Sequence, residues 1–311
     1  MSTNRFTKKS TRWPAMMAVS VAFALGAFAL AGPAQASTDI PSKHVPSATP
    51  FTGAHTGKTA AAELSPALAK PKGYVVVSSA ALTSNAGTQT HGSVVCPTGK
   101  VPLGGGVFFS SGSVLANINS SYPTATGWSA DVNNASASAS SFNVYVTCSK
   151  KPAHYALVSG ASTTVNAGAQ VSNITATCTA PAKPLGGGLF SNTTSTLANV
   201  NSSIPVTGGW RVDANNASGS PESVTTYLVC GTLKKYHEVT GTATTNAAGT
   251  QTGVTVACGT GVAVGGGGFS SSGSTAVSLN TTYPVSGGWR TYENNNSTAT
   301  ASITPYAICS G

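Results

Sequence analysis

The sequence from Tyr74 onward is one pattern that occurs three times, and this repetition constrains the fold more than any other feature. The tyrosines that open the copies, Tyr74, Tyr155 and Tyr236, are 81 residues apart both times. Each copy then has a cysteine, a glycine run, an Asn-Ser-Ser or Asn-Thr-Thr triplet, a Gly-Trp pair, an Asn-Asn pair and a final Tyr-x-x-Cys. A repeat of about 80 residues is the size of a small domain, so the pattern predicts three modules, at 74–152, 153–234 and 235–311.

The landmarks align position by position across the copies. The first cysteines are Cys96, Cys178 and Cys258; the glycine runs are 104–106, 186–188 and 265–268; the triplets begin at Asn119, Asn201 and Asn280; the tryptophans are Trp128, Trp210 and Trp289; the Asn pairs are 133–134, 215–216 and 294–295; and the last cysteines are Cys148, Cys230 and Cys309. This agreement is too extensive for chance.

Within a copy the pattern is that of an all-β fold. Segments rich in Val, Ser, Thr and aromatic residues alternate with turns that contain Gly or Asn, and no ten-residue helical pattern occurs. The strands predicted for the first copy are 74–82, 90–96, 101–111, 114–122, 127–135 and 140–149. Alternation is clearest at Phe142, Val144, Val146 and Cys148, which would share one face. The predicted fold class is therefore all-β, with three tandem small sandwich or barrel modules.

The N-terminal residues predict an export signal. Four basic residues between Arg5 and Arg12 precede an apolar run from Ala15 to Ala31, and a small-x-small cleavage pattern ends at Ala36. This arrangement is typical of a secretory signal peptide at 1–36. An uncleaved membrane anchor is the alternative, but the run is shorter than the roughly 20 residues of a usual span. We expect a secreted protein, extracellular or associated with the cell wall, with no membrane span after cleavage.

Residues 37–73 and the charge balance complete the outline. Prolines interrupt a Ser-, Thr- and Ala-rich segment there, which predicts a flexible leader rather than a structured extension. The formal charge of +9 falls to +5 without residues 1–36, and 73–311 hold eight basic and five acidic side chains, a net +3. Such a balance does not predict nucleic-acid binding. We interpret Lys150-Lys151 and Lys234-Lys235, which lie between copies, as solvated junctions.

The cysteines predict one disulfide per copy. Pairing Cys96 with Cys148, Cys178 with Cys230 and Cys258 with Cys309 gives separations of 52, 52 and 51 residues. A polar module of this size has a thin core, and closing such a loop would stabilise it by about 4 kcal/mol. Pairing between neighbouring copies is the alternative. Zinc binding is disfavoured because there is no close Cys pair and no nearby set of histidines, and we expect neither a metal nor a cofactor.

The recurring Trp, Tyr and Asn positions are the candidates for ligand binding. A sugar needs a flat apolar face and amides for its hydroxyls, and the candidate residues are Trp128, Trp210, Trp289, Tyr122, Tyr283, Asn134, Asn216 and Asn295. The alternative, which we favour, is that each Trp fills the core of its own module and the amides are surface groups or turn formers. Exposed indoles beside amides would favour sugar binding, and buried indoles would favour a scaffold.

Signals for catalysis are weak. The glycine runs lack the Lys-Ser/Thr and the following helix of a phosphate loop, so we interpret them as sites of close strand packing. Asp131 and Asp213 occupy equivalent positions, but the third copy has Tyr292 there, and no copy has a recurrent carboxylate pair. The histidines fall at different repeat positions. We therefore expect no enzyme, and an extracellular hydrolase with a site between modules is the second alternative.

A resemblance to a known module extends this interpretation. The string Cys-Pro-x-Gly-Lys-x-x-Leu-Gly-Gly-Gly at 96–106, followed by Ser-Tyr-Pro, Gly-Trp, Asn-Asn and Tyr-x-x-Cys, resembles a module of secreted proteins of high-GC Gram-positive bacteria, at the ends of collagen-like or phage tail-like chains. The second copy departs from it at Ile204, and the third has Val264 before its glycines. The resemblance covers nearly all of 74–311 and implies secretion and an extracellular interaction role. If single modules cap trimeric chains, three tandem copies would form a pseudo-threefold unit.

These observations together predict a secreted, non-enzymatic structural or surface-interaction protein. A lectin-like protein that binds carbohydrate or cell-wall material is the first alternative. The expected partner is an extracellular glycan, a cell-wall polymer or another surface protein, and not nucleic acid.

Overall fold

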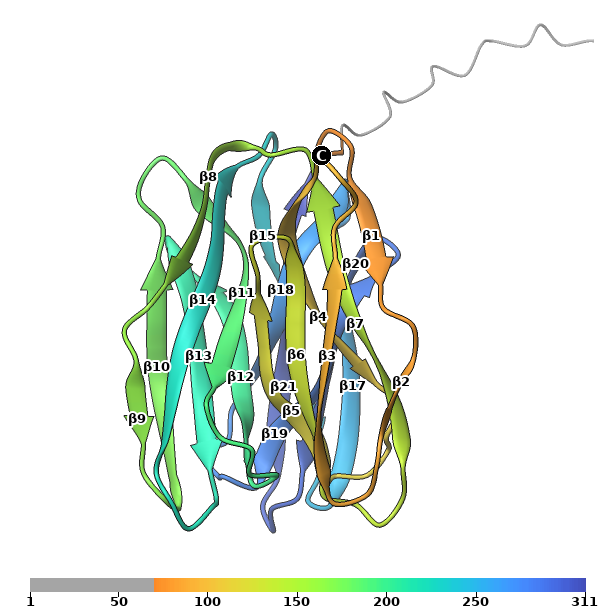
Figure 1. Cartoon of the computed structure of the whole chain (residues 1–311), viewed down its shortest axis with the longest axis vertical. Coiled ribbons are helices and arrows are strands. Elements are labelled where there is room, and N and C mark those ends of the chain that lie inside the picture. Colours follow the sequence, from red (N-terminus) through yellow and green to blue (C-terminus); the bar gives the residue numbers. More distant parts are fainter. Residues whose placement is uncertain (1–69) are drawn as a thin grey trace, which may run out of the picture. The chain divides into compact units, whose positions relative to one another are not determined.

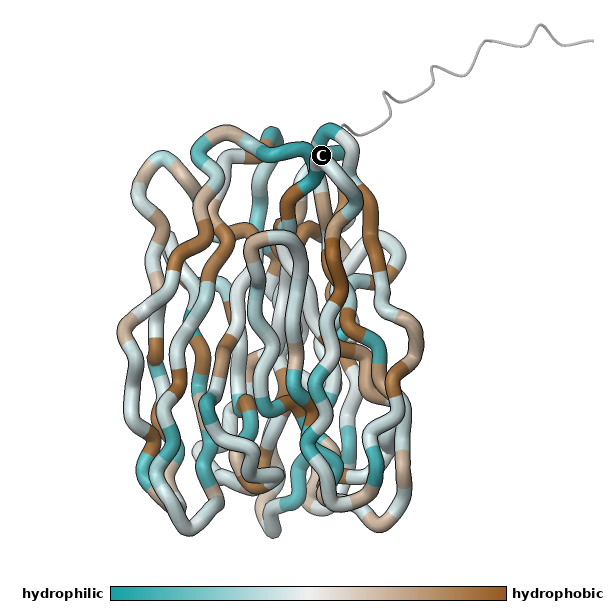
Figure 2. Tube along the Cα trace, viewed as in Figure 1, coloured by the Kyte–Doolittle hydropathy of each residue, from teal (hydrophilic) through white to brown (hydrophobic). Residues whose placement is uncertain are grey.

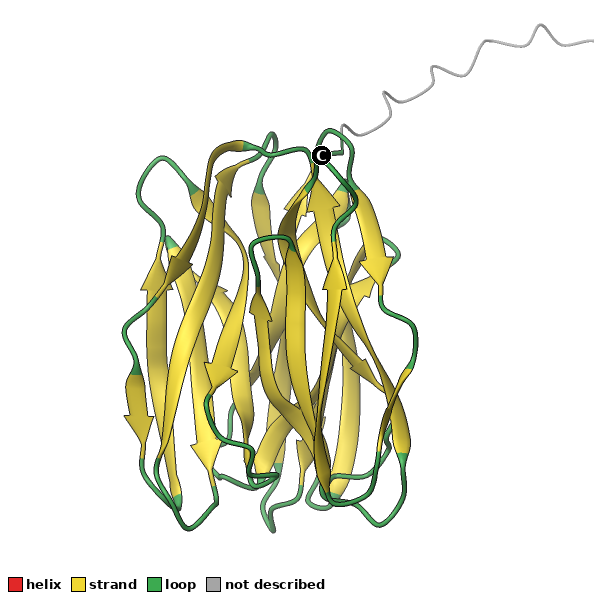
Figure 3. Cartoon of the chain, viewed as in Figure 1, coloured by secondary structure: helices red, strands yellow, loops and turns green. Residues whose placement is uncertain are grey.

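The computed structural model describes residues 70–311, and this part of the chain consists of strands, turns and loops without a helix (Figure 3). The described residues belong to one compact unit. This part of the chain therefore has no helix that would cross a membrane. The predicted signal peptide at 1–36 and nearly all of the predicted leader at 37–73 lie outside the described residues.

Each repeat contributes seven strands. The first repeat has β1 (Val75–Ser78), β2 (Leu82–Ser84), β3 (Thr88–Val95), β4 (Val101–Phe109), β5 (Ala116–Pro123), β6 (Gly127–Asn134) and β7 (Ser140–Ser149). The second has β8 (Ala153–Ser159), β9 (Thr163–Val165), β10 (Ala169–Thr177), β11 (Lys183–Ser191), β12 (Ala198–Val206), β13 (Gly209–Asn216) and β14 (Glu222–Thr232). The third has β15 (His237–Thr240), β16 (Thr244–Asn246), β17 (Thr250–Ala257), β18 (Val262–Ser270), β19 (Val277–Val285), β20 (Gly288–Asn295) and β21 (Ala301–Ser310).

The strand predicted at 74–82 is instead two short strands, β1 and β2. Ser79 lies between them, and its N–H donates to the carbonyl of Val144 (2.9 Å). The N–H of Val144, however, donates to the side-chain Oγ of Ser79 (3.0 Å). In the first repeat this side chain thus takes the place of a main-chain acceptor where the regular ladder is interrupted. The same interruption separates β8 from β9 and β15 from β16, where Gly160 and Gly241 donate the equivalent N–H without such a side chain.

The three sheets are each shared between two repeats (Figure 1). Strands β1, β2, β7 and β4 of the first repeat join β19, β20 and β17 of the third. Strands β3, β6 and β5 of the first repeat join β11, β14, β8 and β9 of the second. Strands β10, β13 and β12 of the second repeat join β18, β21, β15 and β16 of the third. Every repeat thus divides its strands between two sheets, and the three repeats form a pseudo-threefold cycle.

Where two repeats meet within a sheet, the regular pairing is reduced to one residue pair. The pairs join β4 to β19, β11 to β5 and β18 to β12, and they are Val107 with Thr282, Leu189 with Ser121 and Gly268 with Ser203. These positions are equivalent in the three repeats. Ladder hydrogen bonds are thus a minor part of each seam, and side chains must supply most of its contacts.

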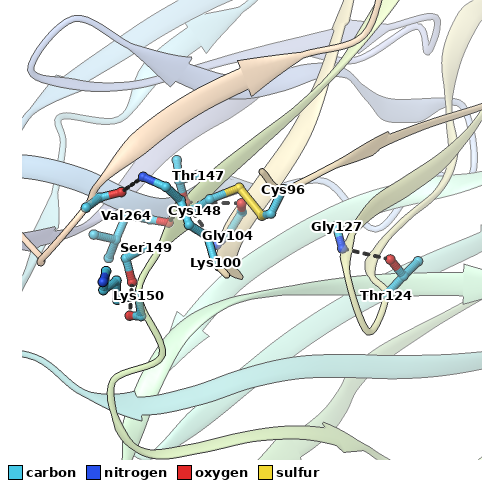
Figure 4. The surroundings of a disulfide bond; sticks show 11 residues. Cys96, Lys100, Gly104, Thr124, Gly127, Thr147, Cys148, Ser149, Lys150 and Val264 are labelled. Atoms are coloured by element: carbon cyan, nitrogen blue, oxygen red, sulfur yellow. Dashed lines mark hydrogen bonds between the residues drawn. A yellow bond between two sulfur atoms is a disulfide. The ribbon is translucent and has the colours of Figure 1, made fainter. Parts of the chain in front are cut away.

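Each disulfide connects the two sheets to which its own repeat contributes. Cys96 directly follows β3, and Cys148 lies in β7 (Figure 4). The bridges Cys178–Cys230 and Cys258–Cys309 are equivalent, so the predicted pairing within each copy is confirmed. A covalent link between two sheets holds the thin core of a repeat together where few apolar side chains are available.

The apolar core lies between the sheets and continues from repeat to repeat. Phe142, Val144, Val146 and Cys148 are fully buried, which confirms the alternation predicted for this strand. The largest cluster of buried apolar residues contains members of all three repeats. Figure 2 shows hydrophobic stretches along the strands and hydrophilic stretches that recur in the loops at both ends.

The connections lie at two opposite ends of the strands. We call one the junction end: it contains the segments 70–73, 150–152 and 232–235, which enter the three repeats, and it also contains Ser310 near the C-terminus (Figure 1). The other, the loop end, contains the loops that precede β5, β12 and β19. Both ends are therefore built from all three repeats.

Candidate functional site

The three tryptophans of the repeats fill the cores of their own repeats. Each has 0% of its surface exposed. The buried indole Nε1–H donates to a hydroxyl on the paired strand, in the pairs Trp128–Ser121 (2.9 Å), Trp210–Ser203 (2.9 Å) and Trp289–Thr282 (2.7 Å). Since the N–H groups are satisfied internally and the rings are enclosed, no indole presents a face to a ligand.

The glycine runs allow backbones and rings to approach closely. A Cβ on the second glycine of each run, Gly105, Gly187 or Gly266, would overlap the indole of the same repeat. The first glycines of the runs lie against the main chain at the start of another run, and the third glycines lie against a main-chain carbonyl of another repeat. This agrees with the close-packing interpretation and leaves no glycine loop free to hold a phosphate.

The second asparagine of each Asn pair stabilises the turn that follows it. Asn134 donates through Nδ2 to the carbonyls of Ser84 and Ser138 (both 2.9 Å), and its Oδ1 accepts from the N–H of Ser136 (3.2 Å). Asn216 and Asn295 make the equivalent bonds, and all three asparagines are fully buried. Their amides are therefore turn formers and are not available to a sugar hydroxyl.

The first asparagine of each pair and the asparagine of each triplet join one repeat to the next. Both donate to a single main-chain carbonyl, at the distances Asn133–Ala198 2.7 Å, Asn119–Ala198 3.0 Å, Asn215–Val277 2.7 Å, Asn201–Val277 3.0 Å, Asn294–Ala116 2.6 Å and Asn280–Ala116 2.7 Å. The first repeat thus bonds the second, the second bonds the third, and the third bonds the first.

The hydroxyl that follows the asparagine of each triplet also crosses a seam. Its oxygen accepts a main-chain N–H of the neighbouring repeat, in the pairs Ser120–Ser191, Ser202–Ser270 and Thr281–Phe109, each at 3.0 Å. Together with the asparagines, these bonds use nearly all the polar atoms of the recurring triplets. The polar side chains that recur in the sequence thus form the hydrogen bonds that close the ring of three repeats.

The two candidate tyrosines lie at seams and are only half-buried. Tyr122 packs against Phe190 (ring centroids 5.3 Å apart) and Tyr227 (5.5 Å), both from the second repeat. Tyr283 of the third repeat packs in the same way against Phe108 (5.4 Å) and Tyr145 (5.2 Å) of the first. The remaining seam has Ile204 in this position, and there the Arg211 guanidinium covers Phe269 (5.3 Å).

A hollow adjoins the first of these aromatic clusters. It has a volume of about 290 Å³, and its walls include Tyr122, Pro123, Leu157 and Tyr227. Leu157 is 40% exposed, which is unusual for a large apolar side chain in this molecule. The structure thus combines a half-buried tyrosine pair, an apolar wall and open space at one seam. Tyr122 was predicted as a candidate from the sequence, whereas Tyr227 was not, because its role depends on contact with another repeat.

The carboxylates do not converge on one site. Asp131 contacts His91 (2.8 Å), and Asp213 forms an ion pair with Arg211 (2.8 Å). Each lies on its own repeat, and neither is accompanied by a second acid. Among residues 70–311, no three His, Cys, Asp or Glu side chains gather as a metal site.

Two glutamates are buried at the places where two repeats lack a large apolar side chain. In the first repeat Phe109 packs edge-on against Phe142 (6.1 Å). The equivalent residues are Ser191, whose Oγ donates to Glu222, and Ser270, beside Glu293. Burial raises the pKa of Glu222 and of Glu293 above 4.5, although hydrogen bonds to these serines partly oppose the shift. The carboxyls therefore fill core space, each in a different repeat.

Lysines gather around a hollow at the junction end. The hollow has a volume of about 410 Å³, and the charged residues that line it are Lys70, Lys72, Lys150, Lys151 and Lys234. Lys150-Lys151 and Lys234-Lys235, interpreted from the sequence as solvated junctions, are exposed. Their convergence was not predictable from the sequence, because three segments about 80 residues apart meet only after the ring has closed.

The pseudo-threefold axis itself contains little space. A cavity of about 10 Å³ on the axis has room for at most about one water molecule. A hollow of about 140 Å³ at the loop end is lined by all three repeats, including the exposed side chains of Leu115 and Leu197. The interior is thus a packed core and not a channel.

Comparison with known proteins found no protein-family model that matches the sequence and no curated protein similar to it.

Proposed function

We propose that the chain is a secreted, non-enzymatic structural or surface-interaction protein whose three repeats form one rigid β unit. The observation that carries this proposal is the use of the recurring residues. The tryptophans, the asparagines and the triplet hydroxyls all serve packing or ring closure. The residues that recur in every repeat therefore maintain the fold. We infer that any binding function depends on residues at the surface of the three-repeat unit.

The disulfides support an extracellular location. Three bridges, one per repeat, indicate an oxidising environment, since such bonds are rare in reducing compartments. The predicted signal peptide points the same way from an independent part of the sequence. Secretion and association with the cell wall follow as parts of the proposal.

The carboxylates support a non-catalytic role. A glycoside hydrolase needs two carboxyl groups on either side of one bond, with an open site between them. Here Glu222 and Glu293 are 4% and 0% exposed and belong to different repeats, while Asp131 and Asp213 have partners of their own. A hydrolase between modules thus gains no support from the positions of the acids.

The test is to incubate the disulfide-bonded protein with isolated cell envelopes and with a panel of extracellular polysaccharides. Bound protein is measured by sedimentation, and released soluble fragments by a reducing-sugar assay. We expect binding without release of fragments. Sustained release that scales with protein concentration would show an enzyme, and failure to sediment with every envelope and polymer would contradict a surface-interaction role.

Glycan binding is the second candidate, and the seam tyrosines favour it where the tryptophans do not. Tyr122 and Tyr227 form a tilted pair beside a hollow of about 290 Å³, and Tyr283 with Tyr145 repeats this pair at a second seam. Half-buried aromatic rings offer their faces to the C–H surface of a sugar. We therefore place the candidate glycan sites at these two seams.

The third seam provides the variant for this test. Because Ile204 already occupies the equivalent position, Tyr122→Ile and Tyr283→Ile introduce a side chain that the fold accommodates. We expect the double variant to lose polysaccharide binding by about tenfold, as expected for the loss of two aromatic contacts. Tyr306→Ile, at the seam without a tyrosine pair, is the matched control. Unchanged binding by the double variant would exclude these seams as glycan sites.

A further inference from the structure

The junction end concentrates the positive charge of the described residues. All eight lysines of 70–311 lie there: five line the hollow, Lys100 donates through Nζ to the carbonyl of Gly73, Lys183 opens β11, and Lys235 follows Lys234. The sequence shows a nearly neutral repeat region, whereas the fold places its lysines at one end. The charge of residues 70–311 is therefore polarised along the axis of the three repeats.

Few acidic groups oppose this charge. Of the five acidic side chains in 70–311, Asp131 and Asp213 have partners on the sheets, and Glu222 and Glu293 are buried away from the junction end. Glu238 lies at the junction end, where it accepts the hydroxyl of Tyr236 (2.6 Å). The two ion pairs of the described residues involve no lysine. Lys100 donates to the Gly73 carbonyl and the Lys151 ammonium lies 5.7 Å from the centre of the Tyr155 ring, but no carboxylate neutralises either lysine, so the charge of the hollow can act on an external anion.

The arrangement of the lysines indicates the kind of anion. Arginine forks suit bidentate recognition of one group, whereas lysines act as mobile point charges that bind phosphates without fixed geometry. Several lysines around one open hollow fit a flexible chain with regularly spaced charges better than a small ligand. Phosphodiester groups along a polymer provide such charges.

Two other anionic surfaces fit less well. A membrane-binding surface combines lysines with exposed apolar anchors, but the only large apolar side chain lining this hollow is Leu233, which is half-buried. Single-stranded nucleic acid is bound through stacking on aromatic faces, and none of the aromatic residues in 70–311 is fully exposed. A phosphodiester polymer without bases needs neither feature.

We propose that the junction-end hollow binds a polyol-phosphate polymer, a flexible chain of phosphodiester-linked polyols. This inference rests on the proposed surface-interaction function and names the partner chemistry of one surface. Lys70, Lys151 and Lys234 are provided by the three different connections, so the site exists only in the closed ring. The binding is electrostatic. Its affinity therefore falls steeply as the salt concentration rises, because the release of counterions from the polymer then contributes less free energy.

The test measures binding of the disulfide-bonded protein to poly(glycerol phosphate) oligomers by calorimetry at several salt concentrations. The variant Lys151→Gln/Lys234→Gln removes two charges from the hollow. The matched control, Lys183→Gln/Arg290→Gln, also removes two charges but outside the hollow. We expect the hollow variant to bind at least about tenfold more weakly, because each lysine near a polyanion contributes about fivefold, and the control to change by less than about twofold.

Neutral polyglycerol, vesicles that contain phosphatidylglycerol and an oligothymidylate are the comparison ligands. The proposal requires the poly(glycerol phosphate) to bind more tightly than each of them. It is overturned by undetectable binding at low salt, by equal weakening in both variants, or by tighter binding to the vesicles or the oligonucleotide. If the polymer does not bind while isolated envelopes still do, this inference fails and the proposed function stands.

Discussion

Single positions in the core show how the repeats tolerate different solutions to the same packing problem. Phe109 fills a site in the first repeat, whereas a serine and a buried glutamate share the equivalent site in each of the other two. The glutamates come from different strands, Glu222 from β14 and Glu293 from β20. A protonated, neutral carboxyl can fill core space much as an apolar group does, whereas burying an ionised carboxylate there costs folding free energy. We therefore expect the stability of the core to depend on pH through Glu222 and Glu293 in the second and third repeats, and not at this position of the first.

Glu293→Gln is expected to raise the stability of the protein at neutral pH. Burial raises the pKa of this carboxyl in the folded state, so the folded protein retains a proton that the unfolded chain releases above pH 4.5. The contribution of Glu293 to stability is thus lost as the pH rises from about 4.5 through the raised pKa. Thermal unfolding from pH 4 to pH 8 should show a higher midpoint for the variant at pH 7 and a vanishing difference near pH 4.

The control for this substitution is Glu238→Gln, since Glu238 is exposed on β15. Its unfolding midpoint should follow that of the unmodified protein across the pH range. The prediction would be contradicted if the unfolding midpoint of Glu293→Gln lay below that of the unmodified protein at pH 7 and approached it only near pH 4.

The roles of single residues were predictable where they depend on their own repeat. One large aromatic in each small polar module is enough to favour a core position, and Trp128 is indeed enclosed. The role of Asn133 was not predictable, because its partner is the main-chain carbonyl of Ala198, 65 residues away. A carbonyl has no sequence signature, and the sequence does not state which repeat lies next to which. For the same reason the sequence did not predict that Tyr227 of the second repeat contacts Tyr122 of the first.

Main-chain hydrogen bonds hold the strands of one repeat together, whereas side-chain contacts hold neighbouring repeats together. Antiparallel neighbours within a repeat form long ladders, such as β4 with β7. The seams between repeats have one ladder pair each and depend on side chains. Strand positions followed from alternation and turn residues, but the division of each repeat between two sheets did not, since alternation shows which face is buried and not which strand is adjacent.

Removing one disulfide should destabilise the whole unit. The double substitution Cys178→Ala/Cys230→Ala opens a loop of 52 residues, and the chain-entropy model gives a loss of about 4 kcal/mol in the free energy of unfolding. Urea denaturation of the variant is expected to show a lower midpoint. The equivalent substitutions in the first and third repeats should give similar losses, because their loops have 52 and 51 residues. Unchanged midpoints would show that the seams alone fix the sheets.

At the level of the whole molecule the three repeats form one body. Tyr74 of the first repeat donates its hydroxyl to the carbonyl of Ala263 in the third (2.6 Å), and the asparagine bonds pass around the ring in one direction. The repeat count predicted three modules, and the resemblance suggested a pseudo-threefold arrangement. The fused sheets go further than an arrangement of separate modules, because each sheet needs two repeats to exist.

The repeats are therefore expected to unfold together. Scanning calorimetry should give one transition with equal calorimetric and van't Hoff enthalpies, and hydrogen exchange should show similar opening free energies for β7, β14 and β21. Gly188→Ala, which places a Cβ against the Ser121 carbonyl across one seam, should lower the stability of all three repeats by about 1–3 kcal/mol. Loss of protection in the second repeat alone would show independent modules.

The direction of the asparagine bonds has a consequence for the order of folding. The carbonyl of Ala116 in the first repeat accepts hydrogen bonds from Asn280 and Asn294 in the third. These bonds cannot form before residues more than 160 positions later in the chain are in place. Each disulfide, by contrast, connects cysteines of one repeat, so its formation requires no other repeat. Until the third repeat is in place, the seam of the first repeat is incomplete, and we expect this segment to be the one most exposed to association with another chain.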